Sequence, residues 1–453
     1  MMLKNKDKLF RKTRGWYIFS KVIHFYLRLF YKQIVVEGKE LIPKGCPVIF
    51  APNHQNALMD PLILHFGARM QTVFLARADI FKIPVLRDFF FWLKILPVFR
   101  IRDGIENLQN NDESFNIAVE VLEHGRSVGI FPEATHTNLR RLLPLKKGVP
   151  RLAFLAESKN NFSLGIKVIP VGIHYSNYEK MHSTVHIRFG EAIEVATFRD
   201  AWLQNQQKAM LLLRDEIGSR ISDLAINIKD THSYDTIFRA SELLAKPLLL
   251  ATGEKRVNQE KKFKSQRAIT RILEQDKLTS IGQESSLFGK TEEFVTLLTK
   301  FKVGSLGMGI KPGVIRLTWF KIFLVLFVPV YLYGALNGIP KSFFLQLLLK
   351  KFKDRQFHSS IKYVWGMVVA PLFFVAQAAL VWVLSGNALW ALVYLLSIPI
   401  GVVFSKIYLI WIEKFISALR LVHLRLLKPQ LFNRVLNSFH VVLEGLGKAY
   451  QKM

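Results

Sequence analysis

Two long uncharged stretches near the end of the 453-residue sequence constrain its fold more than any other feature. They run from Tyr363 to Leu384 and from Ala388 to Phe404, with only Ser385-Gly386-Asn387 between them. As a helix, each stretch is long enough to cross a hydrocarbon core of about 30 Å, and the short break suits a hairpin turn. The sequence therefore predicts an all-α, membrane-embedded carboxyl-terminal part.

Basic residues flank both ends of this predicted hairpin. They gather between Lys341 and Lys362 and again from Lys406 onward. Because basic flanks favour the cytoplasmic side of a membrane, both flanks are expected there. A preceding apolar run, 322–349, is then expected to be re-entrant and to bend at Gly338-Ile339-Pro340. Three crossings are the alternative. The predicted membrane part spans 318–453, with spans near 363–384 and 388–404 and a basic tail.

Residues 1–32 predict an amphipathic helix that docks on a membrane. Aromatic and aliphatic residues alternate with Lys and Arg from Lys12 to Tyr31, which makes the segment too charged to span a bilayer. Such a helix lies in the membrane interface, packs on the next domain, or does both. The formal net charge of +29 and the 36 Phe residues favour an anionic membrane as partner over nucleic acid.

Short apolar runs alternate with helical segments from residue 33 to about residue 230. The runs that predict strands are 33–37, 47–51, 72–76, 96–101, 127–131, 167–174 and 185–189. This alternation predicts an α/β domain at 33–230, with a mixed sheet flanked by helices. Residues 231–317 predict a helical connector. Its glycines at 304, 307 and 309 do not join a strand to a helix and therefore do not indicate a nucleotide loop.

The first polar cluster follows the predicted strand 47–51. Asn53 is expected to cap the next helix, and His54 stands where the strand ends. Asp60 is close enough in sequence to turn back toward the imidazole. A carboxylate on one ring nitrogen of His54 fixes the tautomer and leaves the other nitrogen to accept a proton. The alternative is a histidine that only caps or packs beside an ordinary helical aspartate.

Three further motifs follow in order. The run Leu96-Pro97-Val98-Phe99-Arg100-Ile101-Arg102 ends in two arginines, whose planar guanidinium groups suit a phosphate but which are also common as plain surface residues. Phe131-Pro132-Glu133-Ala134-Thr135 supplies an acid and a hydroxyl, and Lys146-Lys147 adds positive charge. Val168-Ile169-Pro170-Val171-Gly172 predicts a strand with an internal proline, which is expected to shape a pocket and not to take part in the chemistry.

Together these motifs resemble those of the glycerolipid acyltransferase superfamily, the lysophosphatidate and glycerol-3-phosphate acyltransferases. The resemblance covers roughly the first half of the chain. Five residues separate His54 from Asp60 where the family usually has four, as in a branch that resembles fungal glycerol-3-phosphate/dihydroxyacetone-phosphate acyltransferases. Ala134 replaces the usual Gly, so its turn either avoids positive φ or is strained.

The resemblance implies a role for each matching residue. His54 would be the catalytic base and Asp60 would orient it. The acceptor would be bound by Asn53, Arg100, Arg102, Glu133, Thr135, Lys146 and Lys147. Backbone N–H groups near the start of the motif helix are expected to stabilise the oxyanion. Neither a metal nor a cofactor is expected.

The implied reaction moves an acyl group from acyl-CoA or acyl carrier protein to a hydroxyl of a glycerol phosphate, in phospholipid biosynthesis. The expected partners are a phospholipid membrane, the thioester donor and the glycerol-phosphate acceptor. The active site is expected on the cytoplasmic side of an integral membrane protein. Two alternatives remain open: another lysophospholipid or an amino-lipid as acceptor, or a non-catalytic lipid-binding or scaffold protein.

Overall fold

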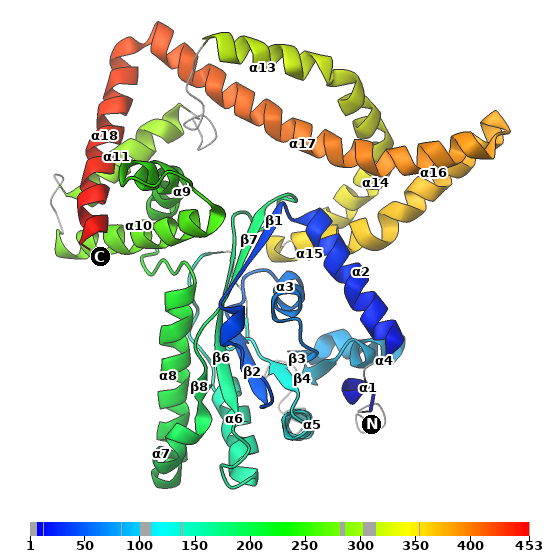
Figure 1. Ribbon diagram of the computed structural model, residues 1–453, viewed down its shortest axis with the longest axis vertical. Helices are drawn as coiled ribbons and strands as arrows, with labels where there is room; N and C mark the ends of the chain where they lie inside the picture. The colour runs from blue at the N-terminus through cyan, green and yellow to red at the C-terminus, as the bar shows by residue number, and fades with distance from the viewer. Residues whose placement is uncertain are drawn as a thin grey trace. The chain divides into compact units, whose positions relative to one another are not determined.

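The computed structural model describes residues 7–11, 13–82, 84–99, 110–135, 137, 139–280, 286–301, 314–352 and 354–452 (Figure 1). The chain divides into two compact units. The first comprises Met1–Ile226 and Asp354–Ser360, and the second comprises Asn227–Lys353 and Ile361–Met453. The expected connector glycines Gly304, Gly307 and Gly309 lie outside the described residues.

An eight-stranded mixed sheet forms the centre of the first unit. The strand order is β1-β7-β6-β2-β5-β3-β4, and β8 pairs with β6. β7 and β8 run antiparallel to β6, and the other pairs are parallel. The bounds are β1 Gln33–Glu37, β2 Val48–Pro52, β3 Thr72–Arg77, β4 Ile95–Val98, β5 Ser127–Gly129, β6 Lys167–Tyr175, β7 Thr184–Phe189 and β8 Ile193–Glu194. The α/β fold with a mixed sheet is therefore confirmed.

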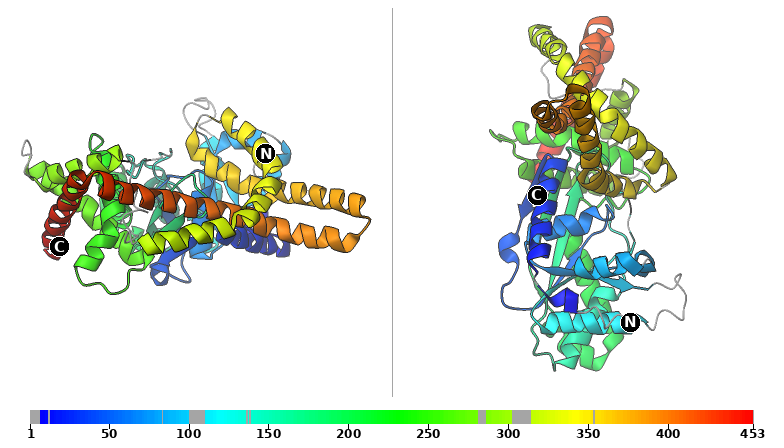
Figure 2. Two further views of the ribbon diagram at one scale, coloured as in Figure 1. Left: turned by 90° about the horizontal axis from the view of Figure 1, so that it is seen from above. Right: turned by 90° about the vertical axis from the view of Figure 1, so that its right-hand side faces the viewer.

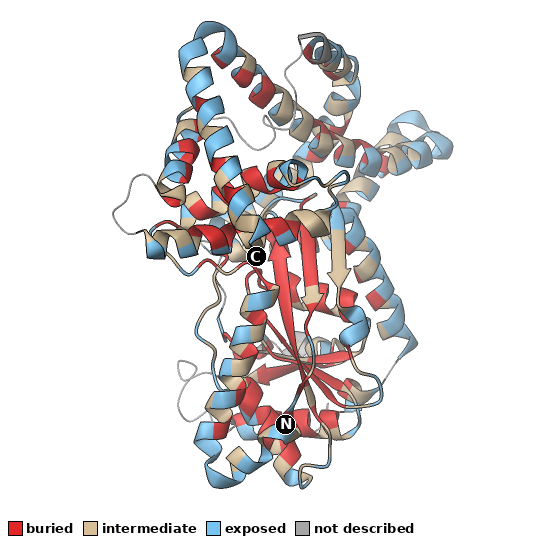
Figure 3. Ribbon diagram, turned by 60° about the vertical axis from the view of Figure 1, so that its left-hand side comes forward, coloured by how far each residue is buried: buried red, intermediate tan, exposed pale blue. Residues whose placement is uncertain are grey.

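Helices cover both faces of this sheet, and its strands are largely buried (Figure 3). Because strand side chains alternate between faces, Ile49 and Ala51 of β2 join the core under α5, α6 and α8, while Phe50 faces the other side. On that other side, Gly67 of α3 lies against Ile187 of β7. The helices of this unit are α1 Asp7–Phe10, α2 Arg14–Phe30, α3 Met59–Ala68, α4 Pro84–Trp92, α5 Asn110–Glu123, α6 Gly148–Lys159, α7 Arg199–Gln204 and α8 Gln206–Leu224.

Helix α2 has two apolar sides. Thr13 caps it by accepting a hydrogen bond from the Trp16 N–H at 3.1 Å. One side is buried in the first unit through Ile23, Leu27 and Phe30. The other side leaves a row of large apolar side chains exposed, namely Tyr17, Ile18, Val22, Phe25 and Leu29. The helix therefore packs on the first unit and still presents an apolar surface.

Among the described residues of the second unit, the regular elements are all helices. α9 Tyr234–Ala251, α10 Gln259–Thr279, α11 Leu287–Lys300 and α18 Pro429–Gln451 pack against one another. The apolar helices are α13 Val314–Leu326, α14 Val328–Lys351, α16 Ala370–Ser385 and α17 Ala388–Leu427, with α15 His358–Val364 leading into α16. Figure 2 shows α16 and α17 lying side by side as an antiparallel hairpin.

Two helical segments are long and apolar enough to cross a membrane, Arg355–Ser385 and Ala388–Leu427. Between them Gly386 adopts φ 65°, which suits glycine. Asn387 then caps α17 by accepting hydrogen bonds from the N–H groups of Leu389 and Trp390. The hairpin turn predicted at this position is present.

The bend in the preceding apolar segment differs from expectation. α13 and α14 meet at an angle of 51° next to Phe327, whereas α14 continues as a helix through Gly338-Ile339-Pro340. Pro329 at the start of α14 fits this position, because proline begins a helix readily and disfavours the helix that would run into it. If this bent pair is a single span, three segments can cross a membrane; the re-entrant path stays a prediction.

Candidate active site

The carboxyl ends of three neighbouring strands bring the predicted site residues together. β2 lies between β5 and β6, and all three run parallel. His54 follows β2, Glu133 follows β5, and Tyr175 ends β6. Parallel strands end at a common edge of the sheet, where ligands usually bind. The strand order therefore gathers side chains that are up to about 120 residues apart.

His54 and Asp60 form the pair that the sequence predicts. The Nδ1 of His54 lies 2.8 Å from an Oδ of Asp60. The imidazole is 17% exposed and the Asp60 side chain 0%. The ring also stacks on Phe131, with 4.2 Å between centroids. Because Nδ1 donates to the carboxylate, Nε2 is the ring nitrogen that would take a proton.

The five-residue separation does not prevent this contact. Ala57 lies between the two residues and adopts φ 39°, a positive value that is rare for alanine. The local turn that it makes brings Asp60, in the first turn of α3, back to His54. The longer motif thus preserves the pair through one strained residue.

Asp60 is fully buried, and donors surround its carboxylate. One oxygen accepts the N–H groups of Gln55 and Asn56, each at 2.7 Å, besides His54. The other accepts the hydroxyl of Tyr175 at 2.8 Å. Burial, together with the nearby Asp60 charge, raises the pKa of Tyr175 well above its usual value, so the phenol stays protonated and donates. These charge-assisted bonds compensate for the burial of the carboxylate.

Glu133 connects two loops at the site. One of its oxygens accepts the His54 backbone N–H at 2.7 Å, and the other accepts the Leu143 N–H at 2.8 Å. Burial raises the pKa of Glu133 to about 7; the two backbone donors act against this rise and the Asp60 charge adds to it. In the structure Glu133 therefore joins the loop that carries His54 to the loop that carries Leu143. Its expected contact with acceptor hydroxyls stays a prediction.

Asn53 does not cap the motif helix, contrary to expectation. Its side-chain oxygen accepts the Ile173 N–H at 2.6 Å, and its amide donates to the Ile173 oxygen at 3.0 Å. The reason is that Asn53 directly follows β2 and continues the pairing with β6 through its side chain. α3 instead begins after Leu58, which forms no side-chain cap.

Three other predicted substrate-binding residues lie in the loops next to Glu133, where the Lys146 N–H donates to the Pro132 oxygen at 2.7 Å. Thr135, Lys146 and Lys147 are exposed, and the Lys147 ammonium donates to Gln207 at 2.8 Å. Ala134, which stands where the family has glycine, adopts φ 56°, so the turn is made with strain. Arg100 and Arg102 lie outside the described residues.

A second layer of side chains around the motif was not predicted from the sequence. Arg140 is buried and donates to the backbone oxygens of Tyr175 and Ser176 at 3.0 and 3.2 Å. Its guanidinium lies 4.8 Å from the ring centroid of Tyr178. The Tyr178 hydroxyl in turn donates to the Gln55 side-chain oxygen at 2.7 Å. No spacing rule connects these residues, so only the fold reveals them.

Two serines from far down the chain complete this layer. Asp354–Ser360 belongs to the first unit although it follows α14 in sequence. The Ser359 hydroxyl donates to the side-chain oxygen of Asn56. The Leu58 N–H donates to the Ser360 hydroxyl at 3.2 Å. Both serines are buried, so the segment is part of the motif's support.

Most of the backbone donors expected to meet an oxyanion are already engaged. The N–H groups of His54, Gln55, Asn56, Leu58 and Met59 each have an acceptor. For Ala57, whose backbone turns at positive φ, the described residues provide no recorded acceptor. Nor do the described residues include a group of three His, Cys, Asp or Glu side chains placed to hold a metal ion.

Sequence comparison matches a profile of the family called Acyltransferase to residues 33–174. A 1-acyl-sn-glycerol-3-phosphate acyltransferase of Borreliella burgdorferi is 30% identical over 201 residues, which cover 43% of this chain and 74% of that protein. Glycerol-3-phosphate O-acyltransferase 2 of Saccharomyces cerevisiae is 23% identical over 336 residues. The match covers 66% of this chain and 43% of the yeast protein, so it spans less than half the length of that relative.

Among solved structures, the 1-acyl-sn-glycerophosphate acyltransferase PlsC from Thermotoga maritima is 22% identical to this chain, with a TM-score of 0.34. The match covers 48% of this chain and 83% of the other.

Proposed function

The chain belongs to the glycerolipid acyltransferase family, and from this premise we propose that it transfers a fatty acyl group from a thioester to a hydroxyl of a glycerol phosphate. One observation carries the proposal. At the common edge of β2, β5 and β6, a partly exposed imidazole is oriented by a buried carboxylate 2.8 Å away. This is the arrangement that a general base requires. A scaffold protein with no chemistry would not need it.

In the proposed mechanism, Nε2 of His54 takes the proton from the acceptor hydroxyl as the hydroxyl oxygen attacks the thioester carbonyl. Asp60 stabilises the imidazolium that forms, and Tyr175 holds Asp60 in place. We assign the Ala57 N–H to the developing oxyanion, since its neighbours already donate elsewhere. Collapse of the tetrahedral intermediate expels the thiolate, which recovers the proton from His54 and leaves as a thiol.

Glycerol-3-phosphate is the acceptor that we favour. The yeast relative, a glycerol-3-phosphate O-acyltransferase by name, matches 66% of this chain, whereas the Borreliella match covers 43%. The longer His–Asp separation points the same way. Lysophosphatidate is the second candidate, because the Borreliella protein, a 1-acyl-sn-glycerol-3-phosphate acyltransferase by name, is 30% identical over 74% of its own length.

We further propose that the protein is embedded in a membrane with its active site on the cytoplasmic side. Arg355–Ser385 and Ala388–Leu427 support the embedding, because each is long and apolar enough to span a bilayer. The basic residues that flank this hairpin support the orientation. Acyl chains partition into lipid, so an enzyme anchored in this way meets its donor and product where they are concentrated.

The test uses the purified full chain in detergent. Labelled acyl-CoA and acyl carrier protein are each offered with glycerol-3-phosphate, lysophosphatidate, other lysophospholipids and an amino-lipid. We expect acylation of glycerol-3-phosphate above the rest. His54→Ala should abolish turnover, while His124→Ala, at an exposed histidine of the same unit, should not change it. Failure to acylate any acceptor, or full turnover by a folded His54→Ala protein, would overturn the proposal.

A further inference from the structure

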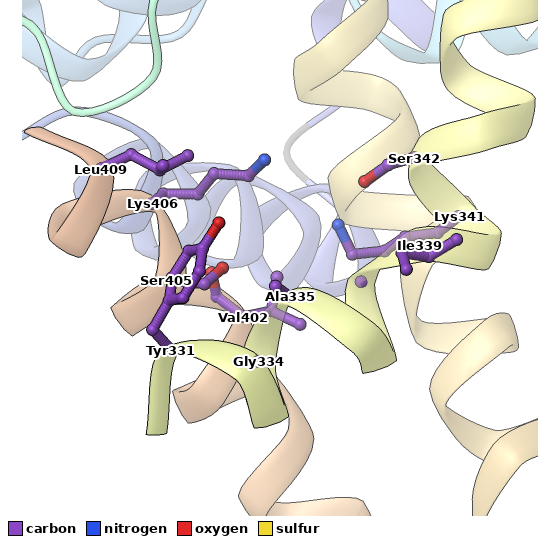
Figure 4. Close-up of a pocket in the computed structure, with 11 residues that line it drawn as sticks. Tyr331, Gly334, Ala335, Ile339, Lys341, Ser342, Val402, Ser405, Lys406 and Leu409 are labelled. Carbon is purple, nitrogen blue, oxygen red and sulfur yellow. The ribbon is translucent and has the colours of Figure 1, made fainter. Parts of the chain in front are cut away.

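The second unit holds a polar pocket between two of its apolar helices, α14 and α17 (Figure 4). Its volume is about 180 Å³. The polar side chains that line it are Tyr331, Lys341, Ser342, Ser405 and Lys406. Polar and charged residues in such helices are costly and usually mark a functional position. The reaction at His54 does not account for this pocket.

The helices approach so closely beside this pocket because glycines meet there. A Cβ added to Gly334 of α14 would lie 1.8 Å from the backbone oxygen of Gly401 in α17. Gly334 itself lines the pocket. Small residues at a crossing let helix backbones touch, as is common in membrane proteins. The pocket is therefore fixed by a tight backbone contact and does not depend on a flexible loop.

The two lysines extend into the same space from opposite helices. Figure 4 shows the Lys341 side chain reaching from α14 and the Lys406 side chain from α17, with the Ser342 hydroxyl nearby. None of the described residues that line the pocket is acidic, and the described part of the chain records no ion pair for either lysine. Two neighbouring ammonium groups repel each other, and a bound anion relieves that repulsion.

We propose that this pocket binds the phosphate group of a membrane phospholipid. Two ammonium groups and the Ser342 hydroxyl offer the donors that phosphate oxygens accept, while the Ser405 hydroxyl donates to the Val402 backbone oxygen at 2.8 Å. The volume of about 180 Å³ is many times the roughly 10–15 Å³ that admits one water molecule, which leaves room for a phosphate and an adjoining ester. The rim includes Ile339 and Leu409, both exposed apolar residues. A rim of this kind favours an amphipathic ligand, whose acyl chains would lie along the helices, over free phosphate.

The test measures lipid binding directly, so its outcome does not depend on whether the chain catalyses acyl transfer. Native mass spectrometry of the full-length protein in detergent micelles counts the bound molecules. Phosphatidic acid is the main probe, diacylglycerol is the lipid without phosphate, and inorganic phosphate and glycerol-3-phosphate are the soluble competitors. The test variant is Lys341→Gln with Lys406→Gln. The matched control is Lys350→Gln with Lys351→Gln, two exposed lysines in the last turn of α14 that remove the same charge.

We expect the native chain and the control to bind one phosphatidic acid with equal affinity and the pocket variant to bind at least ten times more weakly. A Lys341→Arg, Lys406→Arg protein should regain binding, which separates lost charge from lost folding. An equal loss in the control would mean unspecific attraction of anionic lipid and would overturn the proposal. So would unchanged binding by the pocket variant. Displacement of the lipid by millimolar glycerol-3-phosphate or phosphate would reassign the pocket to a soluble ligand.

Discussion

The Ser359 hydroxyl donates a hydrogen bond to the side-chain oxygen of Asn56, which lies between His54 and Asp60 in the chain. Ser360 accepts the N–H of Leu58 at 3.2 Å, so the two serines contact the residues on either side of Ala57. Ala57 carries the positive φ through which the longer motif closes. The turn that sets the His54–Asp60 geometry is therefore held by a segment about 300 residues further along the chain.

Ser359→Ala tests whether this contact positions the motif. The variant leaves the buried Asn56 oxygen without its serine donor, so we expect the turn between His54 and Asp60 to shift. The expected result is a roughly five- to tenfold loss in kcat, which corresponds to about 1–1.4 kcal/mol of activation free energy. The KM for the acceptor should change little, because Ser359 touches the motif and not the substrate. Steady-state kinetics separate the two parameters.

Ser241→Ala is the control for Ser359→Ala, since Ser241 is also fully buried but, within the described part of the chain, its hydroxyl bonds to the Phe238 oxygen of its own helix. It should leave kcat unchanged. Ser359→Thr keeps the hydroxyl and should recover most of the lost turnover. The positioning role would be refuted if Ser359→Ala raised KM alone, or if Ser359→Ala and Ser241→Ala lost kcat equally.

Asp60→Asn and Tyr175→Phe should give graded losses. The asparagine keeps the size but turns a donor group toward His54 or the backbone N–H groups, so the imidazole loses its fixed tautomer. By analogy with catalytic triads we expect kcat to fall by roughly 10³–10⁴-fold. Tyr175→Phe removes one of the four donors to Asp60. It should raise the activation free energy by no more than the strength of that bond, about 1.5–3 kcal/mol, and so lower kcat less than Asp60→Asn does. The assignment of Asp60 as the orienting acid is wrong if the phenylalanine variant is the more impaired of the two.

Glu133→Gln should change how stability depends on pH. Burial raises the pKa of Glu133 in the folded protein from 4.5 to about 7. A raised folded pKa means that the native state binds the proton more tightly. The stability from this proton is thus complete below pH 4.5 and is lost as pH rises through about 7. Relative to Glu133→Gln, the native protein should lose about 3 kcal/mol of unfolding free energy across this window.

Thermal unfolding of both proteins in detergent at about pH 5 and about pH 8 measures this difference. Glu191→Gln, at an exposed residue of the same unit, should follow the native protein at both values. If the difference in unfolding temperature between the native protein and Glu133→Gln is the same at both pH values, Glu133 does not titrate in this range. The interpretation of its burial would then be wrong.

The sequence predicted those parts of the site that depend on local pattern. Alternating apolar runs predicted the strands, and their ends place His54 and Glu133 at one edge. The contact between Ser359 and Asn56 was not predicted, because no spacing rule connects residues so far apart in the sequence. Asn53 satisfied the rule for a helix cap, yet the neighbouring strand offered Ile173, whose backbone takes both of its side-chain bonds. The bend beside Phe327 was predicted at the wrong position. Proline and glycine at several positions permit a break in the helix, and only packing decides at which of them the helix bends.

Labelling of α2 tests its proposed contact with a membrane. Cys46 is the only cysteine, so Cys46→Ser provides a background for single-site labels. A fluorophore on Phe25→Cys, in the exposed apolar row of α2, should be quenched by spin-labelled lipids in proteoliposomes. Leu203→Cys is the control, because Leu203 is equally exposed but lies in α7 away from this row. Equal quenching at both sites would remove the case for docking through α2.

Gly334→Ala tests the close contact that holds α14 against α17. A methyl group there would lie 1.8 Å from the Gly401 backbone oxygen, and a backbone atom cannot move aside as a flexible side chain can. Gly338→Ala, one turn later, meets only ordinary contacts with Val402 at 3.7 Å or more. Both changes raise helix propensity equally, so a difference between them reports the crossing. We expect Gly334→Ala to lower the thermal midpoint in detergent by several degrees, the effect of roughly 2 kcal/mol, while Gly338→Ala leaves it unchanged or raises it. If the two variants unfold at the same temperature, the two helices do not meet at these glycines, and the Lys341–Lys406 pocket beside them loses its structural basis.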